Sequence, residues 1–237
     1  YLSAMIIEGL KKSGLKFGFY DFPNLVRLNP QVPNKTRGNG ALAMHIFTEQ
    51  GCTEEVFKIA CNVVSEHAAL EDDATHPGLV LACGMEVSHQ VRAFYNRCLH
   101  RIVSKEEALN LARSEGMMVW VLKKGLGIIG AIAALGADLT PDQTFELIAY
   151  RDQSEHGRFR DIDESLVLKV DQEVKDTFFN YDYENHKVCI VPASPCPVYF
   201  GLRGETPSAV YEGYKILADG REPFAVLFRT NQHTDAH

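Results

Sequence analysis

Hydrophobic and polar positions along the chain follow two periods, and these predict helices and strands that alternate over most of its length. Apolar residues that recur every three or four positions predict helices at 1–14, 54–70, 91–103, 105–116 and 127–136. Alternating or continuous apolar runs predict strands at 15–28 (a strand pair or one bent strand), 41–48, 78–84, 117–122 and 145–151. The pattern therefore predicts a mixed α/β domain.

Residues that favour helix N-termini predict more closely where several of these helices begin. Thr53 is predicted to cap the helix at 54–70. Ser104 and Glu107 have the spacing of a capping box ahead of 105–116. Thr206 followed by Pro207 predicts another helix start. The continuous apolar run at 117–122 predicts a buried strand.

The composition changes around residues 151–164, where polar and charged residues dominate, and this predicts the domain boundary. We expect residues 1–155 to form the mixed α/β domain and residues 156–237 to form a smaller α+β domain. Strands are expected in the latter at 165–170, 187–193, 197–204 and 224–230, with one clear helix after Thr206. This arrangement is typical of a ferredoxin-like fold.

Composition narrows the class of protein. Hydrophobic residues make up 46% of the 237 residues, which is enough for a substantial core. The net charge of −7 argues against wholesale coating of nucleic acid but permits a local basic patch. No apolar run reaches the roughly 18 residues of a membrane span. The six cysteines form no CxxC pair, which predicts reduced thiols in a cytoplasmic protein without a zinc site.

The segment NPQVPNKTRGNG, residues 29–40, is too long and too cationic for a simple hairpin turn. Its glycines, Gly38 and Gly40, would let backbone N–H groups approach an anion. Lys35, Thr36, Arg37 and Asn39 would add hydrogen bonds to phosphate oxygens. The order of residues is not that of a P-loop, and the alternative is an exposed connection with two surface cations.

The segment KKGLGIIG, residues 123–130, matches GxGxxG between a predicted strand and a predicted helix. One interpretation is a Rossmann dinucleotide site, with Asp152 as the ribose partner. A second is a phosphate at the helix N-terminus, aided by Lys123, Lys124 and Gly125. The third is a glycine turn into a small-residue helix that packs tightly on a sheet.

Three further segments contain candidate metal-binding or substrate-binding residues. Asp72 and Asp73 lie in an acidic run and have the oxygen ligands that Mg²⁺ prefers, although a solvated acidic turn is the alternative. Glu205 precedes Thr206, where it suits the helix dipole or could hold a cationic substrate. The polar C-terminal stretch 229–237, which includes Asp235, is interpreted as a linker, with metal ligation as the alternative.

Several of these strings occur together in one family. RLNPQVPNKTRGNGALA, EHAALEDDATHPGLV, KKGLGIIGAIAALG, YFGLRGETP and RTNQHTDAH resemble, in order, the archaeal tRNA agmatidine synthetases. The resemblance implies an ATP-dependent ligase that attaches agmatine to carbon 2 of the wobble cytidine of an isoleucine tRNA. It also implies a kinase-like catalytic domain followed by a ferredoxin-like domain. The family's opening acidic motif, OB-fold and zinc ribbon are not found in this sequence, so we expect a fragment that is inactive alone.

The resemblance and the residue chemistry together give a set of expected roles. Lys35, Thr36, Arg37, Gly38, Asn39 and Gly40 are expected to hold ATP phosphates or the activated cytidine, with Lys35, Arg37 and Asn39 as the catalytic candidates. Lys123, Lys124 and Gly125 are expected to make a second phosphate contact. Glu205 or Asp235 would pair with the agmatine guanidinium. Asp72 and Asp73 would contribute to Mg²⁺, whose main ligands are expected upstream of Tyr1.

The sequence leaves two other functions open. One is a non-catalytic RNA-binding module, which would bind without ATP turnover and weaken steeply as salt rises. The other is a Rossmann-type nucleotide-binding enzyme that uses the GLGIIG segment.

Overall fold

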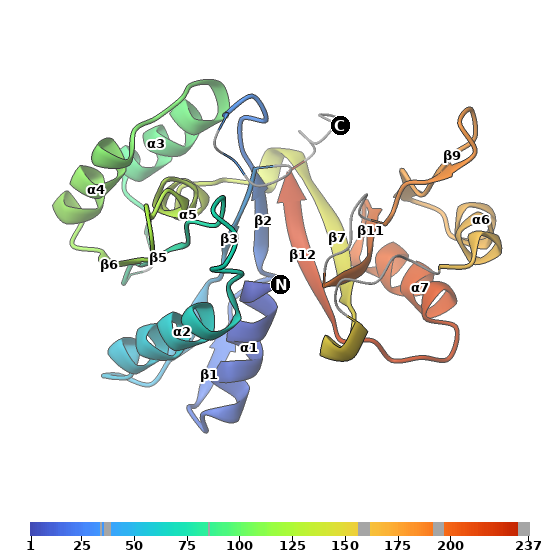
Figure 1. The fold of residues 1–237 in the computed structure, drawn as a ribbon, viewed down its shortest axis with the longest axis horizontal. Helices are drawn as coiled ribbons and strands as arrows, with labels where there is room; N and C mark the ends of the chain where they lie inside the picture. Colours follow the sequence, from blue (N-terminus) through green and yellow to red (C-terminus); the bar gives the residue numbers. More distant parts are fainter. Residues whose placement is uncertain (34, 36–38, 85, 156–161, 192–196, 232–237) are drawn as a thin grey trace. The chain divides into compact units, whose positions relative to one another are not determined.

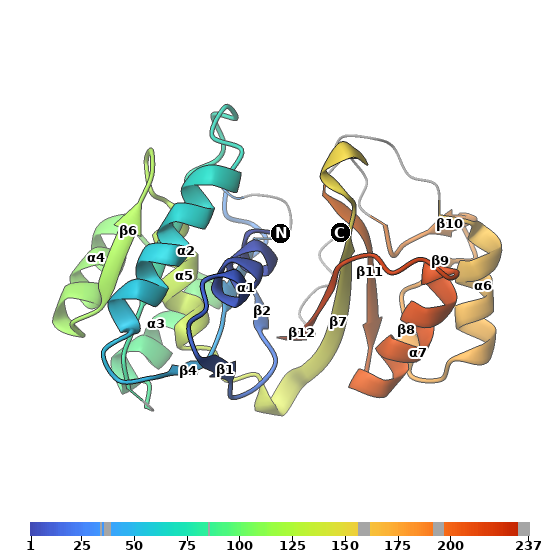
Figure 2. The same ribbon diagram turned by 90° about the horizontal axis from the view of Figure 1, so that it is seen from below.

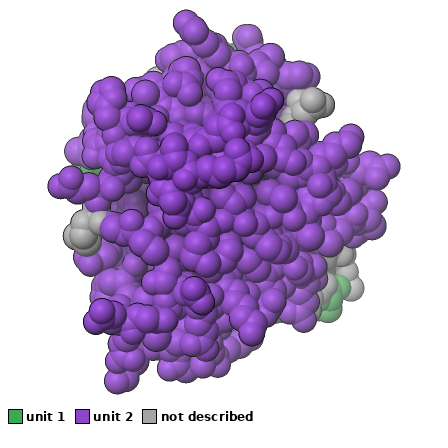
Figure 3. All heavy atoms as spheres, turned by 90° about the vertical axis from the view of Figure 1, so that its left-hand side faces the viewer, with its two compact units in different colours: residues 1, 142–230 green, residues 2–141, 231–237 purple. Residues whose placement is uncertain are grey.

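The computed structural model describes residues 1–33, 35, 39–84, 86–155, 162–191 and 197–231 (Figure 1). The chain divides into two compact units (Figure 3). Unit 1 contains Tyr1 and residues 142–230, and unit 2 contains residues 2–141 and 231–237. The boundary that the composition predicts at 155/156 stays a prediction.

Unit 2 begins with two helices that pack side by side, α1 (Leu2–Lys12) and α2 (Thr53–His67) (Figure 2). Ile6 and Leu10 of α1 meet Val56, Ala60 and Val64 of α2 in one apolar cluster. The strands β1 (Phe17–Phe19) and β4 (Ile46–Thr48), which lie between these helices in the sequence, pair antiparallel. The predicted helical stripes are thus confirmed as buried faces.

The start of α2 differs from the prediction. Thr53 is the first helical residue rather than the cap, and Cys52 occupies the N-cap position without a side-chain hydrogen bond. Glu54 and Glu55 in the first turn give the N-terminus a favourable charge instead.

The remainder of unit 2 is built around the central helix α5 (Gly127–Leu135). It packs against the hairpin of β2 (Asn24–Arg27) and β3 (Gly40–Ala43), and against β5 (Gly78–Leu81). The helices α3 (His89–His100) and α4 (Lys105–Ser114) also contact it. Phe94, Ile128 and Ile132 are fully buried in the shared core.

Two strand predictions in unit 2 need correction. Residues 41–48 form not one strand but β3 and β4, which pair with different partners. The run at 117–122 forms β6 (Met118–Val121), which is only half-buried because it pairs with β5 in a two-stranded sheet. Because β5 and β6 are antiparallel, the GxGxxG segment does not follow a strand of a parallel sheet, and the Rossmann interpretation is wrong.

In unit 1 the sequence order of elements is β7 (Gln143–Tyr150), α6 (Glu164–Glu173), β8 (Thr177–Phe178), β11 (Val198–Gly204), α7 (Pro207–Ala218) and β12 (Ala225–Asn231). The order of strands in the sheet is β12-β7-β11-β8, and β11 is antiparallel to both neighbours. Both helices pack against these strands and each other (Figure 1). This is the ferredoxin-like arrangement. A short hairpin of β9 (Tyr181–Asp182) and β10 (Lys187–Val188) follows β8.

The described residues of unit 1 form two α-helices where the sequence pattern predicts one. Residues 165–170 lie in α6, not in a strand, because Asp163 caps the helix by accepting a hydrogen bond from the Ser165 amide. Val167 and Val170 then face the core at helical spacing. The segment 187–193 is a strand only at Lys187–Val188 among the described residues. The predicted cap of α7 by Thr206 is confirmed.

The last described residue, Asn231, is buried and belongs to unit 2. Its side chain accepts a hydrogen bond from the Arg27 amide at 2.8 Å and donates one to the Arg27 carbonyl at 3.1 Å. These two bonds tie Asn231 to the end of β2. None of the helices in the described ranges is both long and apolar enough to cross a membrane.

Candidate functional site

A pocket of about 1290 Å³ lies within unit 2. Segments that are far apart in the sequence form its wall: Lys35, Asn39 and Gly40 before and in β3, Thr75 and His76 before β5, and Leu126 and Gly127 at the start of α5. Among the described lining residues the cations are Lys35, Arg101 and Lys105, and the carboxylates are Glu86 and Glu115. Much of the remaining wall is apolar. A largely apolar cavity with a few placed polar groups is typical of a ligand site.

The cationic loop, residues 29–40, is closed by hydrogen bonds at its two ends. Asn39 adopts the left-handed conformation with φ 49°, and its side-chain amide donates to the Asn29 carbonyl at 2.8 Å. The Leu28 amide donates to the Asn39 carbonyl at 3.1 Å, and the Asn29 carboxamide oxygen accepts from the Gln31 amide. The loop therefore has fixed ends beside the pocket.

The central residues of this loop, Thr36, Arg37 and Gly38, lie outside the described residues. Lys35 is exposed and lines the pocket, as do Asn39 and Gly40. The described part of the loop is thus brought to the pocket, while the roles of individual residues stay predictions.

The glycine segment before α5 has a packing function. Gly125 has φ 59°, which suits the turn after β6. A Cβ on Gly127 would lie 2.8 Å from the Gly78 nitrogen, and one on Gly78 would lie 2.3 Å from the Ile128 nitrogen. The two backbones meet so closely that neither position accepts a side chain. This supports the interpretation as a glycine turn into a tightly packed helix.

Most amides at the start of α5 are already engaged. The Gly127 amide donates to the His76 carbonyl at 2.9 Å, and the amides of Ile128 and Ile129 donate to the carbonyls of Gly125 and Leu126. A phosphate at a helix N-terminus needs amides that are free to donate. These three are therefore not available to an anion in this conformation.

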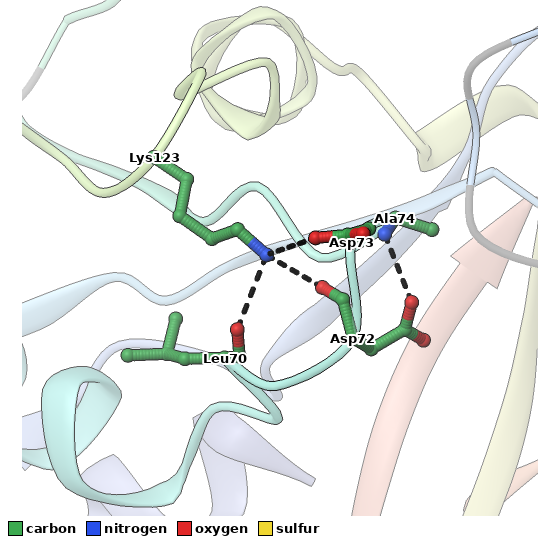
Figure 4. Close-up of polar contacts among 5 residues, drawn as sticks. All are labelled: Leu70, Asp72, Asp73, Ala74 and Lys123. Carbon is green, nitrogen blue, oxygen red and sulfur yellow. Dashed lines mark hydrogen bonds and ion pairs between the residues drawn. The ribbon is translucent and has the colours of Figure 1, made fainter.

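Lys123 points toward the acidic loop, residues 68–77, rather than into the pocket (Figure 4). Its ammonium donates to the Leu70 carbonyl at 3.1 Å and to the Asp72 carbonyl at 2.6 Å, and lies 4.0 Å from an Asp73 carboxylate oxygen. Lys124 contributes its carbonyl to the ammonium of Lys105 at 2.8 Å. None of Lys123, Lys124 and Gly125 is among the described residues that line the pocket.

Asp72 and Asp73 both lie in the acidic loop. The Asp72 carboxylate accepts a hydrogen bond from the Ala74 amide at 2.8 Å (Figure 4), and the Asp73 side chain is fully exposed. Within the described ranges, no group of three or more His, Cys, Asp or Glu side chains is placed to hold a metal ion. The expected contribution of Asp72 and Asp73 to Mg²⁺ binding stays a prediction, because Mg²⁺ is commonly held by only one or two carboxylates together with substrate phosphates and waters.

Two histidines in the pocket wall are not predicted as site residues by the sequence. The Nδ1 atom of His45 lies 2.9 and 3.0 Å from the two carboxylate oxygens of Asp21. The Nδ1 atom of His76 is buried and has no hydrogen-bond partner in the described part of the chain. Both positions depend on contacts that join distant segments, so the local sequence carries no signal for them.

Nucleophilic chemistry by Cys98 is disfavoured at this pocket. Cys98 lies in its wall and is buried, and burial raises the pKa of its thiol to about 12. The thiol is therefore protonated at neutral pH and is a poor nucleophile.

The two residues expected to bind agmatine lie elsewhere in the chain. Glu205 is exposed in unit 1, directly before the N-cap Thr206, and its amide donates to the Asp176 carbonyl at 2.8 Å. Asp235 lies outside the described residues. Neither expected role is tested by these positions.

Comparison with protein-family models gives two adjoining matches. The model of the TiaS TCKD domain matches residues 1–124, and that of the TiaS FLD domain matches residues 125–237. A relative from Methanocaldococcus jannaschii, the isoleucine-tRNA 2-agmatinylcytidine synthetase TiaS, is 38% identical over 244 residues, with 100% of this chain and 56% of that protein covered. The enzyme of the same name from Archaeoglobus fulgidus is 36% identical over 239 residues, with 100% and 55% covered.

Solved structures give the same result. A complex of TiaS with its isoleucine tRNA and ATP matches with a TM-score of 0.87 and 34% identity, over 97% of this chain and 54% of that one. A complex of TiaS with the same tRNA, AMPCPP and agmatine matches with a TM-score of 0.83 and 33% identity, over 97% and 55%. The chain thus spans about half the length of the relatives it matches.

Proposed function

The chain belongs to the TiaS family, and from this premise we propose that it is the catalytic and ferredoxin-like part of an ATP-dependent ligase that attaches agmatine to carbon 2 of the wobble cytidine of an isoleucine tRNA. Related TiaS structures are complexes with ATP, with agmatine and with an isoleucine tRNA. For this chain these molecules are the proposed substrates and partners. A cytoplasmic location stays a prediction.

One observation supports this proposal above the others. Each of the NKTRGNG, EDDATHPG and GLGIIG segments contributes described residues to the wall of a single pocket, although at least one helix separates each pair of segments in the sequence. The pocket is large enough for a nucleotide, since ligand pockets commonly enclose about 300 to 1,000 Å³. Lys35, with Thr36 and Arg37 as further candidates, provides cationic and hydroxyl groups for the phosphates.

The proposed reaction explains why the family brings a triphosphate and a base together. The carbonyl oxygen on cytosine carbon 2 is a poor leaving group. Transfer of a phosphoryl group from ATP to this oxygen converts it into a good one. The primary amine of agmatine then forms a bond to carbon 2, the bond from carbon 2 to the phosphorylated oxygen breaks, phosphate leaves and the amine loses a proton. The protein contributes mainly the positioning of these groups.

The roles of the remaining candidates follow from their surroundings. Gly38, Asn39 and Gly40 would hold the loop close to the phosphates or the activated cytidine. Glu205 and Asp235 are candidates for the agmatine guanidinium. Asp72 and Asp73 are candidates for contributing oxygen ligands to Mg²⁺.

The test is the ATP-dependent incorporation of labelled agmatine into an isoleucine tRNA transcript by the protein at the full length of its TiaS relatives, about half of which this chain spans. We expect Arg37→Ala to abolish incorporation while circular dichroism shows an unchanged fold. Arg113→Ala is the matched control, because Arg113 lies on α4 outside the pocket and bonds to Asn110. Unchanged incorporation by Arg37→Ala would remove the loop from the site. No incorporation by the wild-type protein would contradict the proposed activity.

A further inference from the structure

The conformation of Lys123 indicates that its position is specifically maintained. It lies in the turn between β6 and α5 with φ 53°, in the left-handed region that non-glycine residues seldom adopt. The turn is closed by a hydrogen bond from the Gly125 amide to the Leu122 carbonyl at 2.9 Å. The Lys105 ammonium fixes the next residue by donating to the Lys124 carbonyl. The turn thus aims Lys123 in one direction.

That direction is the tip of the acidic loop. A lysine ammonium has three N–H donors. Two of them meet the carbonyls of Leu70 and Asp72, and the Asp73 carboxylate lies on the remaining side at 4.0 Å (Figure 4). The side chain is only 27% exposed. Because two of its three donors are engaged by main-chain carbonyls and a carboxylate lies nearby, the ammonium is poorly placed to bind a phosphate.

The acidic loop has two kinds of anchor. Its C-terminal end is held by main-chain bonds, from the Leu122 amide to the Pro77 carbonyl at 3.1 Å and from the Gly127 amide to the His76 carbonyl at 2.9 Å. Its tip is folded by local bonds around Asp72, whose carbonyl accepts from the Thr75 amide. Lys123 is the described residue that ties this tip to the β6–α5 turn.

The residues directly after the tip reach the pocket, since Ala74, Thr75 and His76 line its wall. We propose that Lys123 is a positioning residue, which holds the tip of the acidic loop so that Thr75 and His76 keep their places in the pocket wall. This inference rests on the proposed function only for the identity of the pocket's ligand. It replaces the expected phosphate contact of Lys123 with a contact to the protein itself.

The first experiment measures amide hydrogen exchange of residues 69–75 in the intact protein without any substrate. We expect Lys123→Met to accelerate exchange there by at least about tenfold, because hydrogen bonds from a charged donor are lost. Lys123→Arg should restore much of the protection. Lys58→Met is the matched control, since Lys58 is exposed on α2 and does not line the pocket. Lys123→Gly is a second variant, because glycine accepts the left-handed backbone and so keeps the turn while removing the ammonium.

The second experiment measures ATP turnover kinetics of the same variants. Displacement of the pocket wall should raise KM for ATP about tenfold in Lys123→Met, with a smaller effect on kcat, and Lys123→Arg should reverse part of the rise. If exchange at 69–75 is unchanged in Lys123→Met and Lys123→Gly, the proposal is overturned, and a rise in KM would then indicate direct phosphate binding. Accelerated exchange with an unchanged KM would also overturn the positioning role. Hydrogen exchange is measured without ATP turnover. It therefore still tests the contact between Lys123 and the acidic loop if the proposed function is wrong.

Discussion

The side-chain amide of Asn39 donates a hydrogen bond to the main-chain carbonyl of Asn29 at 2.8 Å. The two residues are the first and the penultimate positions of the cationic loop, so this bond closes the loop at its base. This bond fixes the distance between the two ends of the loop. The bond therefore joins the chain that leaves β2 to the chain that enters β3.

This closure predicts a graded loss of stability at Asn39. Asn39→Gly should cost about 1 kcal/mol, because the hydrogen bond is lost but the left-handed backbone is tolerated. Asn39→Ala should cost about 1 to 2 kcal/mol more, because alanine also strains that backbone. Urea unfolding followed by the fluorescence of Trp120, the single tryptophan, reports on unit 2. Asn62→Ala, at an exposed position of α2, serves as control; equal stability of all variants would show that the bond has no structural role.

The contact between Gly78 and Gly127 predicts that Gly78→Ala is poorly tolerated. The new Cβ would lie 2.3 Å from the Ile128 nitrogen and 2.8 Å from the Gly127 carbonyl carbon, both of which are backbone atoms. We expect a loss of about 3 kcal/mol in the same urea assay, the upper end for an overpacked core. Gly116→Ala is the control, because it has positive φ but no atom within 4 Å of the added Cβ. A smaller loss for Gly78→Ala than for this control would contradict the close approach.

Asp163 predicts a specific dependence of stability on pH. Hydrogen bonds from Ser165 lower the pKa of this carboxyl below its unfolded value of about 3.9. A lowered folded-state pKa means that the contribution to stability is present above the unfolded value and is lost as pH falls through the folded pKa. Urea unfolding followed by far-UV circular dichroism should therefore show that wild type exceeds Asp163→Ala in stability at pH 6 and that the difference shrinks toward pH 2. A difference independent of pH would contradict the charged cap.

Lys35 gives a prediction for ligand binding. If it contacts a phosphate oxygen of ATP in the pocket, Lys35→Gln should raise KM for ATP about ten- to a hundredfold, as expected for loss of a hydrogen bond from a charged group. Lys16→Gln is the matched control, because Lys16 pairs with Glu49 at 3.2 Å and does not line the pocket. An equal KM in the two variants would place Lys35 outside the ATP site.

Local interactions explain which elements the sequence predicts well. The capping box of Ser104 and Glu107 and the cap at Thr206 involve residues three positions apart, so their spacing alone is sufficient, and the structure confirms both. The helix α6 escapes prediction for the opposite reason. The run SLVLKV is typical of a strand by composition, and only the packing of Val167 and Val170 in the core of unit 1, together with the cap at Asp163, selects the helix.

In the candidate site, too, the local sequence predicts some residues and not others. A local concentration of glycines and polar residues predicts Lys35, Asn39 and Gly40, and these three do lie at the pocket. The direction of the Lys123 side chain cannot be predicted from the sequence, because its hydrogen-bond partners are 51 and 53 positions away. The pairing of His45 with Asp21 cannot be predicted either, because it requires β1 and β4 to lie side by side.

The two hydrogen bonds between Asn231 and Arg27 span 204 positions of sequence. During synthesis, β2 leaves the ribosome long before its partner in this contact has been translated. Unit 2 therefore reaches its final set of bonds only after nearly all of unit 1 has been made. We expect nascent chains that stop before residue 231 to lack both bonds and to present this end of β2 to chaperones.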